Sequence, residues 1–253
     1  MSKTLALNWK MNPKNKAEFL ELARNYIDFS NVKPRGLIVI PPSIFIPEFN
    51  NSLSSCGLGI QDVSDEQSGA FTAQISAQMA KSIGCQYALI GHSETREYLN
   101  YSNQIVARKV QQAMNNELIP ILCIGYQEST KESDLELNWQ ELKEQIEVGF
   151  SKVGDYQGEL IVAYEPVWAI GTGKTATLEL IEEVNKFIRK TLGAVLNQGQ
   201  LANSKIFYGG SVNEQNILSL AESEVIDGFL VGGASLVPDK VQKMLEILSS
   251  LSL

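Results

Sequence analysis

Eight short apolar segments recur along the chain, and their spacing constrains the fold more than any other feature of the sequence. Each is followed by a longer stretch with apolar residues at helical spacing, and glycine or proline bounds several of them. Consecutive segments begin about 32 residues apart on average, which is the length of one strand–helix–strand repeat. They lie at residues 5–9, 37–40, 58–62, 87–90, 119–124, 160–164, 205–208 and 228–231. The sequence therefore predicts alternating β-strands and α-helices.

The stretches between these segments carry apolar side chains on one helical face, which predicts helices packed against a core. Three such stripes are Val106, Val110, Ala113 and Met114; Trp139, Leu142, Ile146 and Phe150; and Ile181, Val184 and Ile188. The chain shows no composition shift, flexible linker or low-complexity segment. We therefore expect a single domain over residues 1–253, folded as a closed (β/α)8 barrel with parallel strands. A doubly wound open sheet is the structural alternative.

Composition excludes several classes of function. Acidic residues number 29 and basic residues 21, with no lysine- or arginine-rich block, so nucleic acid is not expected as a partner. No apolar run approaches the ~18 residues of a membrane-spanning helix, and the N-terminus lacks signal-peptide features, which predicts a cytoplasmic protein without membrane association. The three cysteines form no CxxC pair and the only histidine is His92, so we expect neither a disulfide framework nor a metal site.

In a parallel barrel the active site forms at the carboxyl ends of the strands, and polar residues follow several of the predicted strands. Asn8 and Lys10 end the first one, and side-chain alternation predicts that both face the barrel axis. His92 shares its parity with Ala88 and Ile90, which predicts an inward imidazole. Ser93 directly after it is expected to cap the next helix, whose N-terminal end would favour a neutral His92.

Glu165 leaves the sixth predicted strand and is followed by Pro166, which restricts its backbone. The apolar segment 166–174 is flanked by proline and glycine, a composition typical of a lid with a hinge at each end. Gly-Gly pairs follow the seventh and eighth strands, the usual phosphate site of such barrels, where glycine lets backbone N–H groups approach an anion. These pairs are Gly209-Gly210 before Ser211 and Gly232-Gly233 before Ala234.

Five motifs together resemble the triosephosphate isomerase family, and the resemblance runs nearly from end to end. They are Asn8-Trp9-Lys10-Met11-Asn12, Ile90-Gly91-His92-Ser93-Glu94, Ala163-Tyr164-Glu165-Pro166-Val167-Trp168-Ala169-Ile170-Gly171-Thr172-Gly173-Lys174, Tyr208-Gly209-Gly210-Ser211-Val212 and Leu230-Val231-Gly232-Gly233-Ala234. The third motif alone is highly specific.

The resemblance implies a TIM barrel isomerase of glycolysis and gluconeogenesis that interconverts dihydroxyacetone phosphate and D-glyceraldehyde 3-phosphate through an enediol(ate). It implies that Glu165 removes a carbon-bound proton next to the substrate carbonyl. His92 would polarise that carbonyl and shuttle protons between the two oxygens, while Lys10 would supply a fixed positive charge. No metal or organic cofactor is required.

The same resemblance implies a set of residues that bind the small phosphorylated triose. Asn8 would help to hold the substrate. The backbone of Gly171, Gly232 and Gly233, together with Ser211, would hold the phosphate. Closure of residues 166–174 would exclude water from the enediolate.

Family members are usually homodimers in which the loop after the third strand inserts beside the partner's active site. Residues 63–74 form a connection of about 12 residues, where ~2 to 6 are usual, so we expect a homodimer through residues 63–79. In the family the positions of Gln74 and Thr95 commonly carry paired charges, and Ala73 also departs from the family pattern. Because both partners are neutral here, we expect an interface that depends little on salt.

Two other functions compete with this one. A Schiff-base aldolase acting through Lys10 on a phosphorylated substrate would be marked covalently by borohydride, whereas an isomerase would not. A noncatalytic barrel would bind phosphate without turnover. The presence of Lys10, His92 and Glu165 at three strand ends argues against this last reading.

Overall fold

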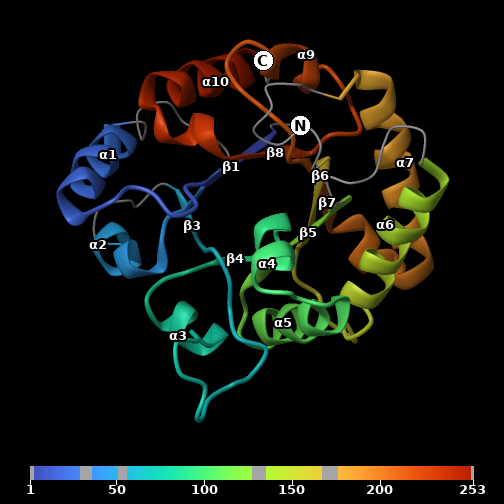
Figure 1. The fold of residues 1–253 in the computed structure, drawn as a ribbon. Helices are drawn as coiled ribbons and strands as arrows, with labels where there is room; N and C mark the ends of the chain where they lie inside the picture. The colour runs from blue at the N-terminus through green and yellow to red at the C-terminus, as the bar shows by residue number, and fades with distance from the viewer. Residues whose placement is uncertain (1–2, 29–35, 51–55, 127–134, 167–175, 252–253) are drawn as a thin grey trace.

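The computed structural model describes residues 3–28, 36–50, 56–126, 135–166 and 176–251. Eight strands, all parallel to their neighbours, close into a barrel in chain order, with the helices around the outside (Figure 1). The strands are β1 (Thr4–Asn8), β2 (Leu37–Ile40), β3 (Gly57–Ile60), β4 (Tyr87–Ile90), β5 (Ile119–Tyr126), β6 (Leu160–Pro166), β7 (Ser204–Tyr208) and β8 (Gly228–Val231). The predicted barrel and its eight strands are confirmed, and the doubly wound sheet is excluded.

Helices follow the strands as the apolar stripes predict. They are α1 (Lys16–Asp28), α2 (Ile46–Asn50), α3 (Ala77–Ser82), α4 (Ser93–Tyr98), α5 (Asn103–Asn115), α6 (Leu135–Gly149), α7 (Leu178–Val195), α8 (Gln198–Ala202), α9 (Ile217–Ala221) and α10 (Pro238–Ser250), with short 3-10 turns at Ser43–Phe45 and Gly233–Leu236. All the stripe residues are buried except Trp139, which is partly buried and packs against the core. No helix of the described ranges is long and apolar enough to cross a membrane.

Side-chain alternation along the strands divides the core into two layers. The inner layer contains strand residues only, among them Ala6, Leu89 and Cys123, and fills the barrel. The outer layer joins the other faces of the strands to the helices, and it includes Leu7 and Trp9. Both layers are packed with apolar side chains. The polar side chains of the strands therefore lie at the strand ends.

Candidate functional site

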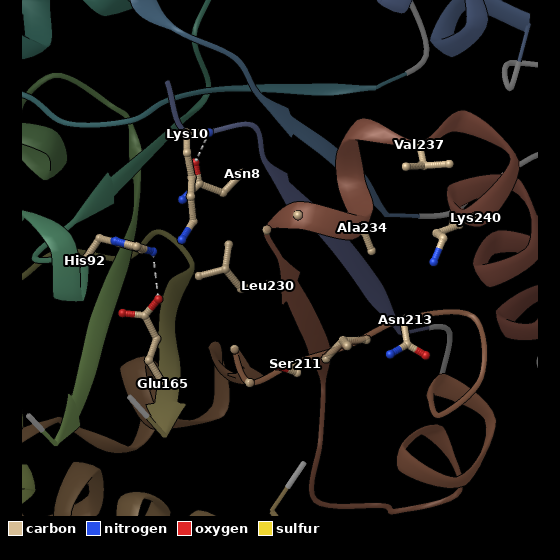
Figure 2. A pocket seen from close by; sticks show the side chains of 15 residues that line it. Asn8, Lys10, His92, Glu165, Ser211, Asn213, Leu230, Ala234, Val237 and Lys240 are labelled. Carbon is tan, nitrogen blue, oxygen red and sulfur yellow. Dashed lines mark hydrogen bonds and ion pairs between the residues drawn. The ribbon is translucent and has the colours of Figure 1, made fainter. Parts of the chain in front are cut away.

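A cavity of about 510 Å³ opens at the carboxyl ends of the strands (Figure 2). Its walls come from the ends of β1, β4, β6, β7 and β8 and from the turns that follow them. The lining residues are Asn8, Lys10, His92, Glu165, Gly209, Gly210, Ser211, Val212, Asn213, Leu230, Gly232, Gly233, Ala234, Val237 and Lys240. The structure thus brings together every site residue expected from the sequence except Gly171. Gly171 lies outside the described residues, as do residues 167–174 of the expected lid.

The end of β1 presents Asn8 and Lys10 to the cavity, as alternation predicts, while Leu7 and Trp9 face the helices. Lys10 has a φ of 52°, in the left-handed region that non-glycine residues rarely adopt. Asn8 Oδ1 accepts a hydrogen bond from the Lys10 backbone N–H at 3.0 Å, and Gln61 Nε2 donates to Lys10 O at 2.7 Å. Two side chains therefore hold the unusual backbone of Lys10 in place.

The ammonium of Lys10 forms an ion pair with Glu94, whose Oε1 lies 2.6 Å from Lys10 Nζ. Glu94 belongs to the first turn of α4, where a negative charge also interacts favourably with the helix dipole. Sequence reasoning assigned no role to Glu94. Two signals in the sequence point to it: its place directly after His92 and Ser93 at a strand end, and its position in the motif Ile90-Gly91-His92-Ser93-Glu94.

His92 faces the cavity, but the parity argument that predicted this is wrong. Ala88 and Ile90 belong to the outer layer of the core, and Leu89 belongs to the inner one. Alternation continued from Ile90 would therefore turn His92 away from the axis. Gly91, with a φ of +71°, breaks the alternation and redirects the chain, which glycine permits because it lacks a Cβ.

The expected cap of α4 also needs correction, because His92 rather than Ser93 occupies the N-cap position. His92 Nδ1 accepts a hydrogen bond from Glu94 N–H at 3.2 Å, so this nitrogen carries no proton in that contact. His92 Nε2 lies 3.0 Å from Glu165 Oε1 and donates to it (Figure 2). The neutral imidazole with its hydrogen on Nε2 satisfies both contacts, and it presents a donor to the cavity.

Glu165 lies near the end of β6, with one glycine beside it in β5 and another directly after β7. A Cβ on Gly125 of β5 would lie 2.0 Å from Glu165 O, and one on Gly209 after β7 would lie 3.1 Å from Glu165 Cγ. The carboxylate is 3% exposed and accepts a hydrogen bond from Ser93 N–H at 3.0 Å through Oε2. Glu165 is therefore a buried carboxylate with a fixed backbone and two donors, His92 and Ser93.

Burial and contact shift the pKa values of this pair in opposite directions. Burial raises the pKa of Glu165, but His92, the Ser93 N–H and Lys10 outweigh it, so the pKa lies below its ordinary value. Burial lowers the pKa of His92, but the adjacent Glu165 carboxylate outweighs it, so the pKa lies above its ordinary value, opposite to the shift expected from the helix end. Glu165 is consequently ionised at neutral pH and available as a base.

The opposite wall of the cavity is made largely of backbone. Gly232 and Gly233 stand at the start of the 3-10 turn Gly233–Leu236, whose first N–H groups have no side-chain cap. A Cβ on Gly232 would lie 3.2 Å from Lys10 Cε, whereas one on Gly233 would meet nothing within 4 Å. Ser211, which follows β7, lines the same cavity (Figure 2). Such a wall suits an anion, since exposed N–H groups at the start of a helical turn attract negative charge.

The sequence is similar to one protein family over nearly its whole length. The family model described as triosephosphate isomerase matches residues 3–249. The triosephosphate isomerase of Vesicomyosocius okutanii subsp. Calyptogena okutanii is 40% identical over 245 residues, 96% of each chain. That of Mesomycoplasma hyorhinis is 39% identical over 253 residues, 98% of this chain and 99% of its own, and that of Alkaliphilus metalliredigens is 38% identical over 238 residues, 93% and 95%.

Proposed function

Since the chain belongs to the triosephosphate isomerase family, we propose that Glu165, His92 and Lys10 form its catalytic centre. The chain is an isomerase that interconverts dihydroxyacetone phosphate and D-glyceraldehyde 3-phosphate, a glycolytic reaction. The observation that carries the proposed centre is the convergence of a buried base, an imidazole donor and an ammonium at the ends of three strands around one cavity.

The chemistry of the proposed centre begins at Glu165. Its carboxylate takes the proton from the carbon next to the substrate carbonyl, and the C–H electron pair forms the double bond of the enediolate. The carbonyl oxygen becomes an oxyanion, which His92 Nε2–H and the Lys10 ammonium stabilise. His92 then moves a proton between the two oxygens, and Glu165 returns its proton to the neighbouring carbon. These steps leave every residue as it began.

The substrate phosphate is assigned to the backbone wall of the cavity. Gly232 and Gly233 supply N–H groups and Ser211 a hydroxyl, with Gly171 a further contact expected from the family resemblance. Asn8 is 4% exposed and lines the cavity beside Lys10, a position that suits it to contact the substrate as well. An anion held at this wall places the carbon skeleton toward Glu165 and His92 (Figure 2).

The Lys10–Glu94 ion pair favours an isomerase over a Schiff-base aldolase. A Schiff-base amine must be free to attack a carbonyl, whereas Lys10 Nζ is held by the Glu94 carboxylate at 2.6 Å. We expect borohydride in the presence of substrate to leave Lys10 unmodified. Peptide mass analysis would detect a reduced adduct, and finding one would support the aldolase.

Shortening Glu165 tests its role as the base. Glu165→Asp retracts the carboxylate by about 1 Å, and misplacement of that size can cost ~10²-fold in rate, so kcat should fall while KM changes much less. Glu159→Asp is the matched control, because Glu159 directly precedes the opposite end of β6 and pairs with Lys205 there. A coupled isomerase assay measures both variants, and a near-normal kcat for Glu165→Asp would show that the base is another group.

We also propose that the chain is a single domain located in the cytoplasm. The same family membership supports a homodimer, which we expect to form through residues 63–79. Large apolar side chains are exposed on the segments that follow the first three strands: Met11 is 93% exposed, Ile44 in the first 3-10 turn 78% and Met79 on α3 56%. Phe71, in the expected loop, is 42% exposed. Neighbouring connections of the barrel thus carry apolar surface of the kind that a partner covers.

The two neutral residues of the expected interface make the dimer testable. Gln74 Oε1 accepts a hydrogen bond from Ser64 Oγ, and Thr95 Oγ1 donates to His92 O, so each has a partner within its own subunit. Sedimentation velocity at several protein and salt concentrations should show a dimer that salt leaves intact. A fully active monomer at micromolar protein would refute the dimer. Dissociation that rises steeply with salt would refute the neutral interface.

A further inference from the structure

A buried glutamine outside the barrel holds the strand next to Glu165. Gln145 lies on α6 and is 3% exposed. Its Oε1 accepts a hydrogen bond from Gly125 N–H at 2.9 Å, and its Nε2 donates to Gly125 O at 3.0 Å. The Gln145 side chain thus hydrogen-bonds both the N–H and the C=O of Gly125, and it links α6 to the end of β5.

A third contact fixes the direction of the Gln145 amide. Its Nε2 also donates to Glu141 Oε1 at 3.2 Å. A rotated amide would place its oxygen against two acceptors, Glu141 Oε1 and Gly125 O, and its NH2 group against the Gly125 N–H. The side chain therefore has one favourable orientation, and the end of β5 has one favourable position relative to α6.

Gly125 transmits this position to Glu165. The two residues face each other in the β5–β6 register, and a Cβ on Gly125 would lie 2.0 Å from Glu165 O and 3.3 Å from Glu165 Cβ. Backbone atoms in such close contact cannot move independently, because the intervening space admits not even a methyl group. A displacement of the end of β5 is therefore a displacement of Glu165.

We infer that Gln145 is a positioning residue for the isomerase, acting on Glu165 through Gly125. The inference rests on the role of base proposed for Glu165. Gln145 does not line the cavity, so it contacts no substrate. Gln145 would affect the rate through the position of Glu165. A misplacement of about 1 Å can cost ~10²-fold in rate, and loss of the two hydrogen bonds between Gln145 and Gly125 should produce part of such a shift.

The test compares two buried glutamines that make the same kinds of hydrogen bonds. Gln145→Met keeps the size of the side chain and removes its contacts with Gly125. Gln200→Met is the matched control: Gln200 is 2% exposed, donates to Gly154 O and Tyr156 O, and accepts from Asn197 N–H, away from the cavity. Thermal unfolding, kcat, KM and the pH profile of kcat/KM are measured for both variants.

We expect Gln145→Met to lower kcat about tenfold with little change in KM. The acidic limb of kcat/KM should move to higher pH, because a displaced Glu165 loses the contacts that lower its pKa. Gln200→Met should lose stability while keeping kcat and the pH profile. If Gln145→Met does not fold, the same measurements on Gln145→Asn, which retracts the amide, take its place.

A folded Gln145 variant with the kcat and pH profile of the unmodified protein would overturn the inference, since its hydrogen bonds would then be structural only. Failure of the underlying proposal looks different. If Glu165→Asp retains kcat, the base is misassigned whatever Gln145 does. If Glu165→Asp loses kcat while Gln145→Met does not, only the positioning role is wrong.

Discussion

Lys10 Nζ lies 2.6 Å from Glu94 Oε1, so the positive charge at the end of β1 is held by the helix that begins after β4. Glu94→Gln removes this charge partner and should release the Lys10 side chain. A hydrogen bond between charged groups contributes about 1.5–3 kcal/mol, and partial exposure of both residues favours the lower end of that range. We expect kcat/KM to fall about tenfold in a steady-state assay.

The control for Glu94 is an ion pair on the same side of the barrel that does not touch the cavity. Glu48 pairs with Lys16 at the surface, and Glu48→Gln should leave kcat/KM unchanged. Equal activity of the Glu94 variant and the unmodified protein would mean that Lys10 holds its place without the ion pair.

His92 is the only histidine of the chain, so its titration can be followed by NMR without assignment ambiguity. Its pKa should lie above the ordinary value, because the Glu165 carboxylate outweighs the effect of burial. In Glu165→Gln the carboxylate is gone while the burial remains, so the pKa should fall below the ordinary value. A pKa that does not respond to this substitution would contradict the 3.0 Å contact.

The same shift has a consequence for stability. A raised pKa in the folded state means that His92 contributes stability below its unfolded pKa, and this contribution disappears as the pH rises through the folded value. Urea unfolding across that pH range should show the decline in the unmodified protein. Glu165→Gln should remove it, whereas a decline of equal size in both proteins would assign it to other groups.

Gly233→Ala tests whether the backbone wall of the cavity binds the substrate phosphate, and it should do so without disturbing the fold. A Cβ at this position meets nothing within 4 Å, so stability should be unaffected, but the methyl group would stand where the anion approaches the N–H groups. KM should rise several-fold, and calorimetry should show weaker binding of inorganic phosphate. Gly193→Ala in α7 is a remote control. Unchanged phosphate affinity in Gly233→Ala would place the site elsewhere.

Lys109 of α5 and its neighbour Arg108 allow a comparison of buried and exposed charge. Lys109 is 2% exposed, and its Nζ lies 2.8 Å from Asp62 Oδ2 and 4.2 Å from the centre of the Tyr101 ring. Lys109→Met removes the cationic partner of Asp62 and leaves its carboxylate with the Tyr101 hydroxyl, so we expect a loss at the lower end of roughly 3–5 kcal/mol.

Arg108 pairs with Asp65, which follows β3 as Asp62 does, but 44% of the Arg108 side chain is exposed. Arg108→Met should therefore cost less than about 1 kcal/mol. Urea unfolding of both variants measures the difference. Similar losses would show that burial does not govern the strength of these pairs.

The strands and the inward Lys10 were predictable because periodicity is a local property. The same rule failed at His92, where one residue with positive φ, Gly91, breaks the alternation that the rule assumes. Position along the chain still placed His92 at a strand end, so the residue lines the cavity although the orientation argument was wrong.

Contacts between distant segments were beyond sequence reasoning. Glu94 is 84 residues from Lys10, and Gln145 is 20 residues from Gly125 and lies on a different element. The local pattern places Glu94 beside His92 but does not reveal its partner, and nothing in it distinguishes Gln145 from other polar residues on helix surfaces. Only the closed barrel, which sets the register of neighbouring strands and the helices over them, makes them partners of the site.

The left-handed backbone of Lys10 is unfavourable in free energy, and the rest of the fold must offset it. A non-glycine residue in the left-handed region is less stable by about 1–2 kcal/mol than glycine would be there. Lys10→Gly should therefore be more resistant to unfolding than Lys10→Ala, although both lose the ammonium and with it turnover. Stability alone would favour glycine here, so under the proposed role of Lys10 activity and durability make opposite demands on one residue.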